Sequence, residues 1–356
     1  MSFPERYTEM VSVMASPILL NLLIRPAPEE YPETARTRRL MKLWETHVGG
    51  GMTDELGDFE DFFEQATRLE AVIATYPLHL IYLTIQGDRT ATNLGTGEAI
   101  HVDELGDITR FGLQASVDLA LNPHLRNESD ADRYLSWDTF KKFAGRNSDY
   151  CGSQADDPTV VDFTDRLFAR YQAGERRVFI KSVAAKKGLW DITLPDTITT
   201  IQELENFLND DEQMGWGLAS AAGSRHAFAI QDYTPMSYEY RFFVVGHKLV
   251  TGAGCVEQHT PLDNNARFDT KMVQNRHRSD SPVLNRPDTA WKLKDFAAQV
   301  VESVKTEHPH VSNYVVDVAM DERGNPLVVE FNSILNSGLY ASNMFAVVQA
   351  LRNSKK

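Results

Sequence analysis

The sequence predicts a mixed protein, with a small N-terminal α/β domain followed by a larger α+β region. Two observations support this class. A helical pattern over residues 58–74 leads into a continuous apolar segment, Leu78–Ile85, as is typical of a strand buried on both faces of a parallel sheet. Further along the chain, two pairs of β-rich segments are each separated by a short turn-forming segment, which indicates antiparallel hairpins.

Length and composition limit what the chain can be. Its 356 residues, 42% of them hydrophobic, can form a large core, and a domain size of about 150 residues gives a prior of roughly two to three domains. The net charge of −14 disfavours binding to a nucleic-acid backbone. Cys151 and Cys255 have no zinc-site spacing. We therefore expect a cytoplasmic protein with no nucleic-acid partner.

The N-terminal region predicts the α/β domain. Met10–Ile24 is apolar but short for a membrane span, is broken by Pro17 and has no basic n-region before it, so we interpret it as a core element, with secretion as the alternative. Residues 58–74 space their apolar side chains at helical intervals ahead of Leu78–Ile85. A polar segment, Asn127–Asp132, then places a domain boundary near residue 126.

The middle of the chain alternates strands and helices. Thr200 and Glu203 form a capping-box pattern at the start of a helix that ends near Asn209. The other predicted elements are a short helix at Tyr134–Phe143 and strands at Arg177–Val183 and Ala227–Gln231.

The C-terminal part predicts two hairpins and two helices. The first hairpin joins Glu239–Val245 to Lys248–Cys255 through Gly246-His247, and a long polar loop follows over residues 257–288. Its remaining predicted elements are a helix at Thr289–Glu307 with Trp291 and Phe296 near its apolar face, a hairpin of Tyr314–Met320 with Leu327–Phe331, and a closing helix at Leu339–Leu351.

The register of the last hairpin brings acidic residues together. A turn centred between Arg323 and Gly324 places Asp317 opposite Glu330, and Asn332 lies on the same face. The side chains predicted to face the other way are Val316, Val318, Val329 and Phe331. Two carboxylates and an amide oxygen suit Mg²⁺, which prefers oxygen ligands. A simple solvated polar face is the alternative.

Basic residues on other strands could bind an anion. Lys181 lies in an apolar strand, where burial is costly without an anionic partner. Lys186 and Lys187 follow in a loop of small residues, and Glu239 and Arg241 share one face of their strand. An arginine there could bind phosphate or carboxylate through two parallel hydrogen bonds. Taken singly, each residue could also be an ordinary surface lysine or a weak ion pair.

The order of these motifs resembles the ATP-grasp fold, in particular a branch common in phages and bacterial conflict-related gene clusters. The resemblance covers roughly residues 126–356. The segments that carry it are, in order, Phe179-Ile180-Lys181, Lys187-Gly188, the strand from Glu239-Tyr240-Arg241 to Val245, Val315-Val316-Asp317-Val318, Val328-Val329-Glu330-Phe331-Asn332 and Gly338-Leu339-Tyr340. It implies two α+β subdomains that sandwich ATP, at 126–231 and 232–356, after an N-terminal domain at 1–125.

The resemblance also implies roles for single residues. Lys181 and Lys187 would contact the phosphates of ATP, with Lys186 competing for the second place. Asp317, Glu330 and Asn332 would hold Mg²⁺. Arg241 would stabilise the transferring phosphoryl group or a substrate carboxylate, oriented by Glu239. The segment containing Gln231, Asp232 and Tyr233 would bind adenine, in part through its backbone.

The activity implied is that of an ATP- and Mg²⁺-dependent carboxylate-amine ligase that forms an acyl phosphate. Its carboxylate and amine substrates stay unidentified and could be small molecules or peptides, and no membrane partner is expected. Two alternatives remain open: a kinase of the same fold that phosphorylates a hydroxyl, and a module that binds ATP without turnover.

Overall fold

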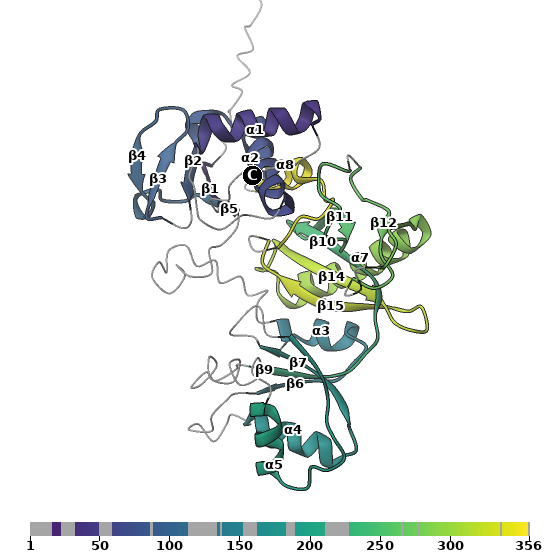
Figure 1. Ribbon diagram of the computed structural model, residues 1–356. Helices are drawn as coiled ribbons and strands as arrows, with labels where there is room; N and C mark the ends of the chain where they lie inside the picture. The colour runs from purple at the N-terminus through teal and green to yellow at the C-terminus, as the bar shows by residue number, and fades with distance from the viewer. Residues whose placement is uncertain are drawn as a thin grey trace, which may run out of the picture.

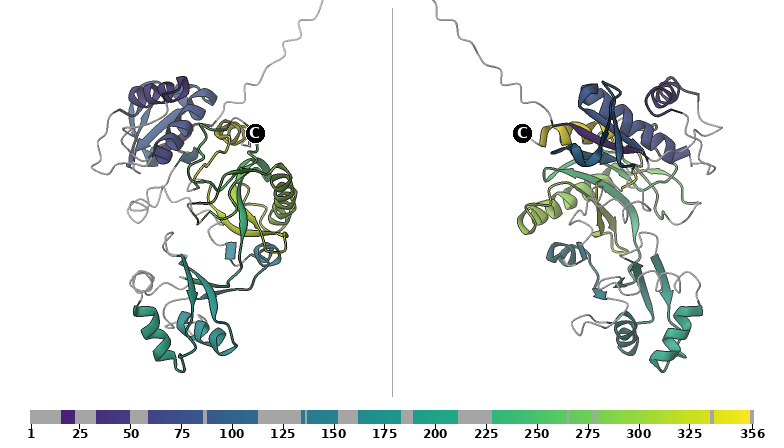
Figure 2. Two further views of the ribbon diagram at one scale, coloured as in Figure 1. Left: turned by 45° about the vertical axis from the view of Figure 1, so that its right-hand side comes forward. Right: turned by 90° about the vertical axis from the view of Figure 1, so that its left-hand side faces the viewer.

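The computed structural model describes residues 16–22, 33–49, 59–85, 88–112, 134–135, 137–151, 162–182, 189–210, 228–264, 266–276, 278, 280–334 and 337–354. Three main sheets follow one another along the molecule (Figures 1 and 2). No helix in these ranges is long and apolar enough to span a membrane.

The N-terminal domain contains a five-stranded sheet of order β4-β3-β2-β1-β5. The central strand β1 pairs in parallel with both β2 and β5, as expected for an α/β domain. Its elements are β1 (Ile18–Leu22), α1 (Ala35–His47), α2 (Phe59–Thr75), the 3₁₀ turn η1 (Leu78–Leu80), β2 (Ile81–Ile85), β3 (Thr90–Asn93), β4 (Ala99–His101), the 3₁₀ turn η2 (Val102–Glu104) and β5 (Thr109–Gly112). The predicted strand at Leu78 is thus shorter than expected, because Pro77 accepts a hydrogen bond from the N–H of Leu80 and closes a turn first.

The second sheet is antiparallel, with order β6-β9-β7-β8. Helices α4 and α5 contribute to the apolar core beside it, and the predicted capping box between Thr200 and Glu203 is present at the start of α5. The elements of this region are α3 (Asp138–Phe143), β6 (Ser148–Cys151), α4 (Phe163–Gln172), β7 (Arg177–Ser182), β8 (Leu189–Thr193), α5 (Ile201–Asp210) and β9 (Phe228–Asp232).

The third sheet, of order β11-β10-β14-β15, is also antiparallel. Its elements and those that follow it are β10 (Ser237–Val245), β11 (Lys248–Gly254), the short pair β12 (Lys271–Met272) and β13 (Leu284–Asn285), α7 (Pro287–Glu307), β14 (Tyr314–Met320), β15 (Pro326–Asn332) and α8 (Met344–Ser354). The predicted hairpin turn is confirmed: Gly246 and His247 both have positive φ, 58° and 56°, as a type I′ turn requires.

Each face of this third sheet packs against a different core. Tyr240, Phe242 and Val316 pack on the side of α7. Phe243 and Val315 lie on the opposite side, in a core shared with α8 and the N-terminal helix α2. Figure 1 shows α8, in yellow, beside α2 of the N-terminal domain. The last helix of the chain therefore joins the third sheet to the first domain.

Three details differ from the prediction. Trp291 is 47% exposed, because the buried stripe of α7 runs through Ala290 and Leu293, and Trp291 is turned about 100° from Ala290. Val329 is only partly buried and Val328 takes its place in the core, because a bulge shifts the register of β14 and β15 beyond Asp317. Helix α8 begins five residues later than expected, after a loop in which Tyr340 has a φ of 47°.

Candidate active site

The predicted lysine and glutamate meet across the gap between two sheets. Lys181 of β7 forms an ion pair with Glu330 of β15 and donates to the hydroxyl of Tyr134 at 3.1 Å. Burial disfavours the charge on Lys181, but the carboxylate of Glu330 outweighs it, so the pKa of Lys181 is raised. Burial works against the charge on Glu330 too, and Lys181 reverses it, so the pKa of Glu330 is lowered. Both groups are therefore charged at neutral pH.

The predicted arginine meets the second carboxylate directly. Arg241 donates from Nε and Nη2 to the two oxygens of Asp317 at 2.8 and 2.6 Å, and from Nη1 to the carbonyl of Gly338 at 3.2 Å. Asp317 is fully buried, and burial raises its pKa to about 6, although Arg241 acts in the opposite direction. At neutral pH the pair is ionised, and the guanidinium fixes the carboxylate in place.

The hairpin register holds where it matters. Asp317 lies opposite Glu330, as predicted, and Asn332 joins them by donating from Nδ2 to Glu330 at 2.7 Å and to Asp317 at 3.4 Å. The sum of paired residue numbers is 647 at the site and 646 nearer the turn, because the bulge absorbs one residue. The three predicted metal-ligating side chains are thus within contact of one another.

The donor chemistry of this cluster fits Mg²⁺. A carboxylate has about four lone-pair positions, so Asp317 and Glu330 keep acceptor capacity beyond the hydrogen bonds they accept here. Ligation by the Oδ1 of Asn332 requires its amide to turn over, since the nitrogen now faces the carboxylates. Among the described residues no three His, Cys, Asp or Glu side chains form a metal cluster. A cation here would accordingly keep waters or phosphate oxygens as further ligands.

The prediction that Glu239 orients Arg241 is wrong. Glu239 accepts from Nη1 of Arg276 at 2.5 Å, whereas Arg241 pairs with Asp317. The reason is geometric: Asp317 lies directly across from Arg241 in the ladder, and cross-strand neighbours have Cβ atoms about 4.5–5.5 Å apart, closer than residues i and i+2 of one strand. Arg276 comes from the long loop after β11.

The side chains of the predicted adenine segment are engaged within the second sheet and its helices. Gln231 is 3% exposed and contacts Arg146 and the hydroxyl of Ser148. Asp232 forms an ion pair with Arg170. The ring of Tyr233 lies 3.4 Å from the guanidinium carbon of Arg177. Nucleotide contacts from this segment would therefore come mainly from its backbone. Lys186 and Lys187 lie outside the described residues.

Arg146 bridges the two sheets, and sequence reasoning missed it. Its Nε donates to Gln231 at 3.2 Å, while Nη1 and Nη2 donate to the carbonyls of Val328 and Val329 at 2.8 and 2.7 Å. The backbone of β15 just before Glu330 is therefore held from the neighbouring sheet. A lone arginine after a predicted short helix gives no signal of this role.

The N-terminal domain also reaches the site. Glu64 of α2 accepts from the backbone N–H groups of Leu339 and Tyr340 at 2.5 and 2.9 Å, and Arg68 donates to the carbonyl of Ser337 at 2.8 Å. These contacts hold the loop whose Gly338 carbonyl accepts from Arg241. Glu64 lies 275 residues from Leu339 in sequence, so no local pattern could have indicated the contact.

Comparison with known proteins places the chain in a family. A family model described as an ATP-grasp domain, the second family of its clade, matches residues 164–350, just over half of the chain. The chain belongs to this ATP-grasp family. It has the ATP-grasp fold, and the predicted fold class is confirmed. No curated protein matches the chain.

Solved structures that resemble the chain include ATP-grasp ligases, all at low identity. D-alanyl-alanine synthetase A from Vibrio cholerae is 11% identical, with a TM-score of 0.46, over 96% of this chain and 99% of that one. The macrocyclase MdnC from Microcystis aeruginosa, solved with its precursor peptide, is 10% identical, with a TM-score of 0.43, over 94% and 98%. D-cycloserine synthetase DcsG is 12% identical, with a TM-score of 0.48, over 83% and 95%.

Proposed function

We propose that this ATP-grasp protein is an ATP- and Mg²⁺-dependent carboxylate-amine ligase. A substrate carboxylate oxygen attacks the γ-phosphorus of ATP, and ADP leaves with the electrons of the broken P–O bond. The amine nitrogen of a second substrate then attacks the acyl carbon, phosphate leaves, and the amine loses a proton. Such transfer asks the protein mainly for positioning and neutralisation of charge.

The observation that carries this proposal is the cluster of Lys181, Glu330, Asp317, Arg241 and Asn332 between two sheets. In the nucleotide-free state its cations and carboxylates neutralise each other. On ATP binding, Lys181 would leave Glu330 for a phosphate oxygen. Asp317, Glu330 and Asn332 would then hold Mg²⁺, which supplies charge neutralisation at the phosphates. Lys187, or Lys186 beside it, would contact the phosphates from the other side.

Arg241 would act in two ways. Its two hydrogen bonds to Asp317 fix that carboxylate, and its positive charge would stabilise the negative charge that develops on the transferring phosphoryl group. Glu239 would hold Arg276 beside this group. The backbone of the segment at Gln231, Asp232 and Tyr233 would bind adenine, at the end of β9 where the chain leaves the second sheet for the third.

We further propose the domain division 1–125, 126–231 and 232–356, and a cytoplasmic role within the phage- and conflict-associated branch of the family. The order of the motifs supports the branch. The substrates would be a carboxylate and an amine, either of which could belong to a peptide.

Two measurements test the function. MgATP should raise the melting temperature, because a ligand that binds only the folded state stabilises it; no shift at millimolar MgATP in folded protein would contradict ATP binding. Free phosphate and ADP should form only when both a carboxylate and an amine are supplied. A stable phosphorylated product without free phosphate would instead establish a kinase, and binding without any turnover a non-catalytic module.

A further inference from the structure

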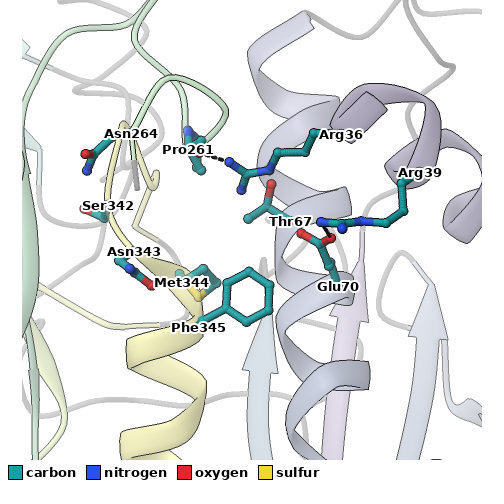
Figure 3. A pocket seen from close by; sticks show the side chains of 10 residues that line it. All are labelled: Arg36, Arg39, Thr67, Glu70, Pro261, Asn264, Ser342, Asn343, Met344 and Phe345. Atoms are coloured by element: carbon teal, nitrogen blue, oxygen red, sulfur yellow. Dashed lines mark hydrogen bonds and ion pairs between the residues drawn. The ribbon is translucent and has the colours of Figure 1, made fainter. Parts of the chain in front are cut away.

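A small polar pocket lies between the N-terminal domain and the start of α8. Its volume is about 160 Å³. The residues that line it come from α1, α2, the loop after β11 and the beginning of α8: Arg36, Arg39, Thr67, Glu70, Pro261, Asn264, Ser342, Asn343, Met344 and Phe345 (Figure 3). None of them belongs to the proposed nucleotide and metal cluster.

One side of the pocket favours negative charge. Arg36 donates to the carbonyl of Pro261 at 2.8 Å, and Arg39 forms an ion pair with Glu70. Burial lowers the pKa of Arg36, and the neighbouring charge of Arg39 lowers it further, despite the opposing effect of Glu70. An anion in the pocket would relieve this. The N-terminal end of α8 adds to the preference, since the first turn of a helix presents backbone N–H groups and a positive dipole end.

Three buried polar atoms in the same pocket have no hydrogen-bond partner. They are Oγ1 of Thr67, Oγ of Ser342 and Oε2 of Glu70. Thr67 and Ser342 are 1% exposed and Glu70 is 8% exposed. Leaving a buried polar group unsatisfied costs about 1–3 kcal/mol, and such groups in native structures call for a partner. Figure 3 shows the hydroxyl of Thr67 directed toward Arg36 and the carboxylate of Glu70 beside it.

These features together describe a receptor for both signs of charge. Arg36 and the end of α8 suit a carboxylate, the hydroxyls suit either donor or acceptor, and the unpartnered oxygen of Glu70 suits an ammonium group. The volume is several times the roughly 30 Å³ of one water but below the roughly 300–1,000 Å³ of pockets for drug-sized ligands. We propose that the pocket binds a free amino acid, with its carboxylate at Arg36 and its ammonium at Glu70.

The pocket is joined to the candidate active site through α2 and the loop before α8. Thr67 and Glu70 lie about 5 and 9 Å along the helix axis from Glu64, which holds the backbone beside Arg241. Asn264 donates to the carbonyl of Ala341, so the pocket wall and this loop are fixed together. The amino acid is therefore well placed to be the amine substrate; that role, unlike the binding itself, rests on the proposed ligase function.

The test is isothermal titration of the full chain with each of the standard amino acids, and with acetate and methylammonium as half-ligands. We expect at least one amino acid to bind, and to bind at least tenfold more tightly than either half-ligand. Arg36→Gln should weaken that amino acid and acetate alike. Glu70→Gln should weaken the amino acid at least tenfold and leave acetate unchanged. Thr67→Val, which keeps the shape, should weaken the amino acid severalfold.

Thr46→Val, on the exposed side of α1, is the matched control and should bind like the wild type. Each variant is checked for its melting temperature and its MgATP shift. The proposal is overturned if no amino acid binds, if acetate binds as tightly as the amino acid, or if Arg36→Gln and Glu70→Gln bind it normally. A normal MgATP shift in the same samples separates this failure from a failure of the proposed function.

Discussion

Replacing Glu330 by Gln should change ATP affinity in opposite directions with and without magnesium. In the nucleotide-free protein Lys181 is held by Glu330, so ATP must break that pair to reach the lysine. Breaking a fully buried ion pair costs about 3–5 kcal/mol. The two side chains are 18% and 22% exposed, and we reduce the cost to about 1–2 kcal/mol for solvent screening.

Without metal, Glu330→Gln should therefore bind ATP roughly 5- to 30-fold more tightly than the wild type, since 1.4 kcal/mol corresponds to about a factor of ten. With Mg²⁺ the variant should bind at least tenfold more weakly, because a charged metal ligand is lost. Isothermal titration in EDTA and in excess Mg²⁺ measures both.

Glu302→Gln serves as the control, because Glu302 forms an exposed pair with Lys305 on α7. It should behave like the wild type under both conditions. Equal weakening of ATP binding by Glu330→Gln in EDTA and in Mg²⁺ would refute the reasoning, since Glu330 would then neither restrain Lys181 nor act through the metal.

Three further predictions concern the surroundings of the site. Arg241→Lys loses the paired hydrogen bonds to Asp317, so denaturant unfolding should show a loss of about 2–3 kcal/mol; turnover should fall by orders of magnitude while the affinity for MgATP, from titration, changes less than about threefold. Glu64→Ala removes the acceptor for two loop N–H groups and should lower kcat at least tenfold in steady-state kinetics with an unchanged MgATP affinity; a normal kcat would exclude a positioning role. The pKa of Asp269 is lowered because His259 and a backbone N–H outweigh burial, so its contribution to stability is present above the unfolded pKa of about 3.9 and lost as pH falls below it. Melting temperatures of Asp269→Asn and wild type should accordingly differ at pH 7 and converge toward pH 3.

The hairpin at the site was predictable because strands alternate faces and paired positions have a constant sum. That rule places Asp317 opposite Glu330 without any knowledge of the rest of the chain. The exchange of Val328 for Val329 was not predictable, because a bulge depends on how the whole sheet twists and packs.

The ion-pair partners were harder to predict. Glu239 and Arg241 share a strand face, which makes them look like a pair, but only the strand order reveals that Asp317 is the nearer neighbour of Arg241. Contacts between domains, such as that of Glu64 with Leu339, leave no trace in periodicity or spacing. They follow from how preformed units dock.

The packing of α8 on α2 has a consequence for synthesis of the chain. Met344, Val347 and Leu351 share one apolar core with Ile18 and Phe62. At about 5–20 residues per second, a ribosome needs roughly 15–60 s for the roughly 290 residues between Phe62 and Leu351. During that time the apolar face of α2 lacks its final cover and depends on chaperones or transient contacts. The part of the chain that is made first is therefore among the last to reach its native packing.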